Sequence, residues 1–142
     1  MPRRLTPLVT GQVYHIFNRG IDRQTTFRDV REYKRARALI NYYRFIDTPA
    51  RFSKFLLIHH DVRNDILAGM RTKGLKYVDI LSYCLMPNHF HFLLRQTEDK
   101  GISKFLANFQ NSYTRYFNTK NERDGALFLN QFKAVLIETD EQ

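Results

Sequence analysis

The sequence of 142 residues lacks the features that are typical of disulfide-stabilised, zinc-binding, membrane-spanning and secreted proteins. It has no tryptophan and a single cysteine, Cys84, which excludes an internal disulfide bond and a four-cysteine zinc site. No apolar run approaches the roughly 18 residues that span a bilayer. The first seven residues are basic and lack the apolar stretch of a secretory signal. These absences predict an intracellular protein with no membrane segment.

Acidic residues are also scarce. Asp and Glu number 14 against 23 Lys and Arg, which gives a net charge of +9. Such an excess predicts a polyanionic partner, either nucleic acid or an acidic membrane surface. The aromatic content of 14% is too high for a disordered basic tail. With no repeat or low-complexity linker, residues 1–142 are expected to form one domain.

The alternation of apolar residues and the turn signals predict an α+β fold. We expect strands over 11–18, 77–86, 89–95 and 132–138, and helices over 29–46 and 101–118. Residues 52–70 fit either a helix or a short buried strand, and we favour the helix. The tight turn Pro87-Asn88 predicts an antiparallel hairpin. This order is typical of a ferredoxin-like sandwich, an antiparallel sheet with helices packed on one side.

The segment His89-Phe90-His91 is the main candidate for chemistry. Side chains alternate along a strand, so His89 and His91 share one face, about 6.5–7 Å apart along it, and can reach one metal ion. Phe90, Phe92 and Leu94 then point to the opposite face and into the core. Spacing alone leaves open the alternative of two surface histidines that bind no metal.

The other histidines and the cysteine show no comparable pattern. His59 and His60 are adjacent, so we expect their side chains to diverge at the surface. We expect His15, on the first strand, to be isolated. Cys84 precedes His89 by five residues across the turn, an offset that argues against a shared zinc site, and Cys84 is expected to be a small buried residue.

The hairpin from Tyr83 to Leu94 closely resembles the signature hairpin of single-tyrosine HUH transposases, where HUH denotes His, hydrophobic residue, His. It is most similar to the IS200-like branch associated with repetitive extragenic palindromes (REP). Further segments that fit this branch are residues 14–20, 101–105, 113–118 and 125–133. The resemblance therefore spans about residues 11–140.

This resemblance implies a DNA transposase or endonuclease that binds single-stranded hairpin DNA and cleaves a strand beside it. His89 and His91 would hold Mg²⁺ or Mn²⁺ against the scissile phosphate. A tyrosine hydroxyl would attack and leave a 5′-phosphotyrosine. The implied location is the prokaryotic cytoplasm, in association with the nucleoid. Members of the family are homodimers or monomers, and both states stay open.

In the family the attacking tyrosine lies on a helix after the last strand, and the same helix carries a polar third metal ligand. Here Thr139 and Gln142 have the spacing of a helix start, and no tyrosine follows Tyr116. We therefore expect the single domain to lack this helix and to be inactive alone, with its nucleophile unassigned. Tyr113 and Tyr116 are the fallback nucleophiles, although both fall on the apolar stripe of their predicted helix and are expected to pack on the sheet.

Basic and polar residues near these motifs are the expected DNA contacts. They are Arg19, Asn88, Lys104, Arg115 and Lys133. Contacts with the phosphate backbone would make binding salt-dependent. The alternative function is a non-catalytic module that binds single-stranded nucleic acid on the same type of sheet, with no metal at the histidine pair.

Overall fold

The computed structural model describes residues 7–138. The helix start expected at Thr139 and Gln142 lies outside the described residues. In chain order the elements are β1 (Val13–Arg19), η1 (Ile21–Arg23), α1 (Val30–Tyr43), α2 (Phe52–Phe55), α3 (His60–Lys73), β2 (Val78–Met86), β3 (His89–Gln96), α4 (Gly101–Asn121) and β4 (Lys133–Ile137). The predicted strands and the two principal helices are confirmed, with their ends shifted by a few residues.

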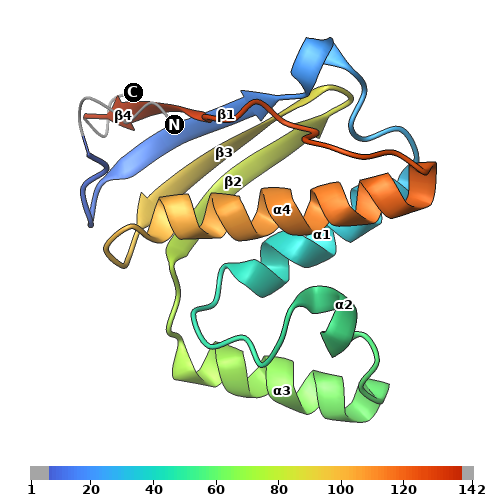
Figure 1. Cartoon of the computed structure of the whole chain (residues 1–142). Helices are drawn as coiled ribbons and strands as arrows, with labels where there is room; N and C mark the ends of the chain where they lie inside the picture. Colours follow the sequence, from blue (N-terminus) through green and yellow to red (C-terminus); the bar gives the residue numbers. More distant parts are fainter. Residues whose placement is uncertain (1–6, 139–142) are drawn as a thin grey trace.

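The four strands form one sheet in the order β2-β3-β1-β4, and every neighbouring pair is antiparallel. This is the strand order of a ferredoxin-like sandwich, as predicted. Helices α1 and α4 lie side by side on one face of the sheet (Figure 1). The α+β class and the one-sided packing of the helices are therefore confirmed.

The core lies between this face of the sheet and the two helices. Phe90, Phe92 and Leu94 on β3 are at most 1% exposed, as their alternation predicted. Phe105 and Phe109 on α4 meet the rings of Phe90 and Phe92 at centroid distances of 5.5 to 5.7 Å, nearly edge to face. Each buried side chain of this kind contributes about 1.5–3 kcal/mol of hydrophobic stabilisation.

Helix α1 begins at a variant of the capping box, which also ties it to α4. Asp29 accepts a hydrogen bond from the Glu32 N–H, and the Glu32 carboxylate accepts one from the Arg28 N–H. The Glu32 side chain is fully buried and is paired with the guanidinium of Arg28 at 3.2 Å and with Lys120 of α4 at 3.0 Å. Burial opposes ionisation of Glu32, but the hydrogen bonds from Arg28 and Lys120 outweigh it and hold its pKa below the usual range.

A close backbone approach anchors the start of α4. A Cβ atom on Gly101 would lie 2.1 Å from the Tyr77 carbonyl oxygen, so only glycine fits there. The Gln96 side chain at the end of β3 accepts a hydrogen bond from the Ile102 N–H. These contacts set where α4 leaves the sheet.

Residues 52–70 are largely helical, as favoured, but they form two helices rather than one. The break lies at residues 56–59, between α2 and α3. Helices α2 and α3 lie beyond α1 and α4, on the side away from the sheet (Figure 1). No helix within residues 7–138 is long and apolar enough to cross a membrane.

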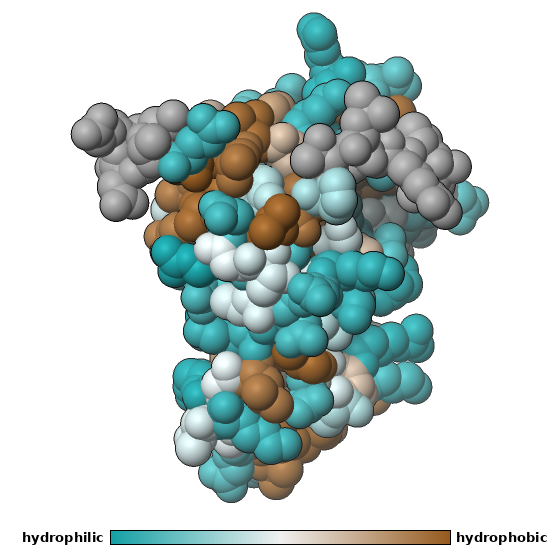
Figure 2. All heavy atoms as spheres, turned by 90° about the vertical axis from the view of Figure 1, so that its left-hand side faces the viewer, coloured by the Kyte–Doolittle hydropathy of each residue, from teal (hydrophilic) through white to brown (hydrophobic). Residues whose placement is uncertain are grey.

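The end of the molecule at the left of Figure 1 has a mainly hydrophilic surface (Figure 2). Hydrophobic side chains gather there in separate patches, beside the sheet and among the lower helices. The edge strand β4 contributes Val135, which is 51% exposed, to the apolar surface of the molecule.

Candidate functional site

The sheet face opposite to α1 and α4 carries both residues of the histidine pair. Directly paired residues of antiparallel strands lie on the same face. His91 pairs with Phe17 of β1 and Cys84 of β2, and His89 pairs with Arg19 of β1. We call this surface the open face, because none of the helices α1–α4 packs on it (Figure 1).

The two imidazole rings are half-buried and close together. Their centroids are 5.0 Å apart and their planes are nearly perpendicular. His89 Nδ1 lies 2.8 Å from the side-chain oxygen of Asn88. Because an amide oxygen only accepts, Nδ1 of His89 carries the proton and its Nε2 keeps a lone pair. Within residues 7–138 the Nε2 atoms of His89 and His91 form no hydrogen bond.

His15 is the third member of this group, and the prediction that it is isolated is wrong. Its Nε2 lies 2.9 Å from Nδ1 of His91, and the two rings stack at 5.1 Å. His15 pairs directly with Leu93, so it shares the open face and reaches His91 diagonally across the two strands. The alternation along the first strand indicates which face His15 occupies. It does not indicate the register between β1 and β3, which places His15 beside His91.

The electrostatics favour neutral imidazole at the centre of this group. Burial lowers the pKa of His91, and the neighbouring His15 and His89 lower it further. Neutral imidazole is the form that binds metal. When His91 Nδ1 donates to His15 Nε2, the Nε2 of His91 also keeps a lone pair, and the two Nε2 atoms then suit a divalent cation. Mn²⁺ is better matched to imidazole than Mg²⁺, which prefers oxygen ligands and retains waters.

A separate group of possible ligands lies at the start of α3. His59, His60 and Asp61 are exposed, and their ligand atoms lie within 4.8 Å of one another; within residues 7–138 no other group of three His, Cys, Asp or Glu residues does so. The expectation that His59 and His60 diverge is wrong, since their ring centroids are 4.3 Å apart. The reason is that His59 is the N-cap, with a non-helical backbone, whereas His60 is already helical.

Cys84 is exposed, so the prediction that it is buried is also wrong. It lies on β2, an edge strand, and points to the open face opposite His91. The two-residue turn places Cys84 and His89 on one face of the sheet, a position that the offset of five residues does not predict. Even so, Cys84, His89 and His91 do not bring their ligand atoms within 4.8 Å of one another.

Neither fallback nucleophile shares the open face. Tyr113 on α4 is fully buried, and its hydroxyl donates a hydrogen bond to the Thr26 carbonyl at 2.5 Å. Burial, with Glu32 adding to it, raises the pKa of Tyr113 far above its usual value, which opposes formation of a phenolate nucleophile. Tyr116, also on α4, lies against the guanidinium of Arg35.

The remaining tyrosines of residues 7–138 are placed similarly. Only Tyr14 and Tyr83 lie on strands, and they pair with Leu94 and Phe92, on the helix-covered face. The others precede β2 or lie on α1. No tyrosine of the described residues therefore projects from the open face beside the histidines.

The expected DNA contacts separate into two groups. Arg19 and Asn88 adjoin His89, and Lys133 of β4 pairs with Phe17 on the open face. Lys104 and Arg115 lie on α4, beyond the sheet from the histidines. The structure thus places three of the five expected contacts around the histidine pair.

A ferredoxin-like sheet with a His-hydrophobic-His pair on its open face has the architecture expected of an HUH protein. The sequence profile of the family described as "Transposase IS200 like" matches residues 41–141. This match covers well over half of the sequence, and the chain belongs to that family.

Two solved structures are similar to this chain. One is the REP-associated tyrosine transposase bound to a REP hairpin, with a TM-score of 0.54, 12% identity and coverage of 99% of this chain. This chain spans 65% of the length of that protein. The other, from Deinococcus radiodurans, is thought to be a transposase; it has a TM-score of 0.49 and 15% identity, and the match covers 96% of this chain and 87% of that one. At 12% identity, the likeness to the first of these structures shows the fold alone. Among curated proteins, none has a sequence that matches this one.

Proposed function

We propose that this chain is the metal- and DNA-binding part of a transposase that cleaves single-stranded DNA beside a hairpin. The observation that carries the proposal is the pair of free Nε2 atoms of His89 and His91 on the open face. Membership in the IS200-like family supports a DNA-processing role. The similar transposase is bound to a REP hairpin, which supports hairpin DNA as the partner.

The residues around the pair would each have a defined task. His89 and His91 would hold Mn²⁺ or Mg²⁺, whose charge stabilises a phosphate under attack. Asn88 and His15 would orient the two imidazole rings through their Nδ1 atoms. Arg19, directly across from His89, would contact the DNA backbone.

In the proposed step a tyrosine oxygen attacks phosphorus while the bond between phosphorus and the 3′ oxygen breaks. The tyrosine loses its proton and the 3′ oxygen gains one, so the products are a 5′-phosphotyrosine and a free 3′ hydroxyl. The tyrosine would come from outside residues 7–138, since none of those described projects from the open face. The chain alone would then bind metal and DNA without cleaving.

Calorimetry with MnCl₂, combined with hairpin binding by fluorescence anisotropy, tests the proposal. We expect the His89→Ala/His91→Ala variant to lose Mn²⁺ binding and to keep hairpin binding. The matched control, His59→Ala/His60→Ala, removes the exposed pair at α3 and should leave both unchanged. If the native protein binds the hairpin but never binds Mn²⁺, the non-catalytic binding module is the correct function.

A trapping assay tests the assignment of the nucleophile. The chain is incubated with Mn²⁺ and a labelled hairpin carrying single-stranded flanks, and covalent adducts are sought by denaturing electrophoresis and mass spectrometry. We expect none. An adduct on Tyr113 or Tyr116 would contradict the proposal.

A further inference from the structure

Arginines gather in two cavities on the helical side of the molecule, away from the histidines. The first, of about 480 Å³, is lined by Arg35 of α1, Arg51 beside α2 and Arg115 of α4. The second, of about 550 Å³, is lined by Arg44, Arg63 and Arg71. We call them the first and second arginine cavities. Helices α1 and α4 lie between them and the sheet (Figure 1).

The two cavities adjoin at α2. Phe52, the first residue of that helix, lines the second cavity, and its neighbours Arg51 and Ser53 line the first. The guanidinium of Arg35 lies 5.0 Å from the centroid of the Phe52 ring. One extended ligand could therefore occupy both cavities.

Neither cavity contains a carboxylate to balance its charge. No Asp or Glu lines either one, and none of the six arginines forms an ion pair within residues 7–138. Lys120 also lines the first cavity, but it is paired with Asp29 and Glu32. The arginines are thus left as uncompensated positive charge in two concave surfaces.

Unsatisfied hydrogen-bond donors point to the same places. Among residues 7–138 the buried side-chain nitrogen and oxygen atoms without a partner are the Nε atoms of Arg35, Arg44 and Arg63. All three arginines line one of the two cavities. Buried polar groups in proteins are nearly always hydrogen-bonded, so each of these donors needs an acceptor from outside the protein, either water or a ligand.

In the first cavity the central guanidinium is held in place by two rings. The guanidinium carbon of Arg35 lies 4.7 Å from the centroid of the Tyr116 ring and 5.0 Å from that of the Phe52 ring. Burial lowers the pKa of Arg35, with Tyr116 and Tyr43 acting in the opposite sense. Contact with the two rings restricts the movement of the guanidinium, and its Nε–H has no acceptor among residues 7–138. The hydroxyl residues Ser53, Ser112 and Thr119 also line this cavity.

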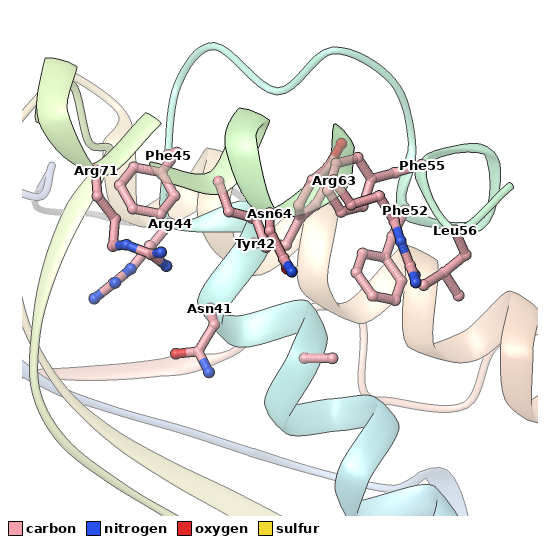
Figure 3. Close-up of a pocket in the computed structure, with 12 residues that line it drawn as sticks. Asn41, Tyr42, Arg44, Phe45, Phe52, Phe55, Leu56, Arg63, Asn64 and Arg71 are labelled. Atoms are coloured by element: carbon pink, nitrogen blue, oxygen red, sulfur yellow. The ribbon is translucent and has the colours of Figure 1, made fainter. Parts of the chain in front are cut away.

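The second cavity combines three arginine side chains with a partly apolar lining. In Figure 3 Arg44 and Arg71 lie at one end and Arg63 lies at the other, near Phe52 and Leu56. Arginines at both ends of one groove match an acceptor that repeats along a chain better than a single small anion.

We propose that the two arginine cavities form a second nucleic-acid site, which binds the phosphodiester backbone of DNA outside the strand held at the open face. A phosphodiester offers the anionic oxygens that guanidinium groups bind best. The choice of DNA as the source of these phosphates rests on the proposed function. The assignment of a phosphate ligand rests only on the arginines that line the two cavities.

The salt dependence of DNA binding tests this site. Each lost phosphate contact lowers the slope of log Kd against log salt by about 0.7–0.9. We expect Arg35→Gln/Arg51→Gln/Arg115→Gln to lower the slope by about 2–2.7. The control Arg31→Gln/Lys34→Gln/Arg37→Gln removes equal charge from exposed positions of α1 that line neither cavity, and should change the slope by less than about 1. Equal effects of the two variants would overturn the proposal.

A second variant tests the first arginine cavity with substitutions that should leave folding intact. Arg51 and Arg115 are exposed, so Arg51→Gln/Arg115→Gln should fold normally, with a native circular dichroism spectrum. We expect it to lower the slope by about 1.5. An unchanged slope in this variant would overturn the first cavity as a contact.

Arginine NMR identifies the ligand directly. The Nε–H resonances of Arg35, Arg44 and Arg63 should shift when a hairpin with single-stranded flanks is titrated. If inorganic phosphate alone shifts them and DNA does not, the site binds a small anion and the nucleic-acid assignment fails.

Repeating the salt titrations in the His89→Ala/His91→Ala background separates this inference from the proposed function. The effect of the arginine substitutions should persist there, because the two sites lie on opposite sides of the sheet. Loss of the arginine effect in that background would overturn the second site. Failure of Mn²⁺ binding in the native protein would overturn only the proposed function.

Discussion

Replacing His15 by phenylalanine tests whether the open face is organised as a metal site. The Phe side chain keeps a ring against Phe17 and His91, whose centroids lie 4.9 and 5.1 Å from that of His15. It removes the nitrogen that meets Nδ1 of His91 at 2.9 Å. Stacking is therefore preserved while the hydrogen bond that orients His91 is lost.

The expected loss of Mn²⁺ affinity follows from the role of residues that hydrogen-bond to a metal ligand. Removing such a hydrogen-bond partner typically weakens metal affinity about 10–100-fold. This corresponds to about 1.4–2.7 kcal/mol at 25 °C. His15→Gln offers both a donor and an acceptor, so it should recover part of the affinity.

Calorimetry with MnCl₂ at pH 7.5 measures the effect, and thermal melts without metal confirm that each variant folds. The electron paramagnetic resonance spectrum of bound Mn²⁺ should also change in His15→Phe, a readout that general destabilisation would not alter. His59→Phe at the start of α3 is the matched control and should bind Mn²⁺ like the native protein. If His15→Phe binds as tightly as the native protein while His91→Ala does not bind, the positioning role of His15 is refuted.

Three further predictions concern stability, each measured by urea denaturation. Gly101→Ala should destabilise the fold by about 3 kcal/mol or more, since its Cβ would meet the Tyr77 carbonyl; a loss below 1 kcal/mol would contradict the contact. Glu32→Gln should lose about 1.5 kcal/mol at neutral pH, because the hydrogen bonds that Arg28 and Lys120 donate to the carboxylate lose their charged acceptor. Because the pKa of Glu32 is lowered, the native advantage should be complete above about pH 5 and shrink as pH falls below about 4. Tyr113→Phe should lose about 1–2 kcal/mol, with DNA binding unchanged.

Local patterns predicted the elements well because their causes are local. The capping box at Asp29, the Pro87-Asn88 turn and the alternation along residues 89–95 act within a few residues, and each appears in the structure as expected. The same alternation correctly assigned Phe90 to the core. Only the resemblance of the hairpin pointed to a transposase, and the match to the IS200-like family confirms it.

The sequence predictions that are wrong concern contacts between strands or at the end of a helix. His15 was expected to be isolated and Cys84 to be buried, yet both lie on the open face with His91. Neither position follows from spacing along the chain, because strand order and register are set by the packing of the whole sheet. The rings of His59 and His60 meet for a related reason, since a new helix begins between them.

The sequence by itself determined the class of fold, the faces of the strands and the identity of the histidine pair, since these follow from periodicity and a local motif. The tertiary structure decided what surrounds that pair. It brought His15 to His91, kept the tyrosines of residues 7–138 off the open face, and gathered unpaired arginines from several helices into two cavities. These arrangements depend on segments far apart in the chain, and only their packing brings such groups within reach of one another.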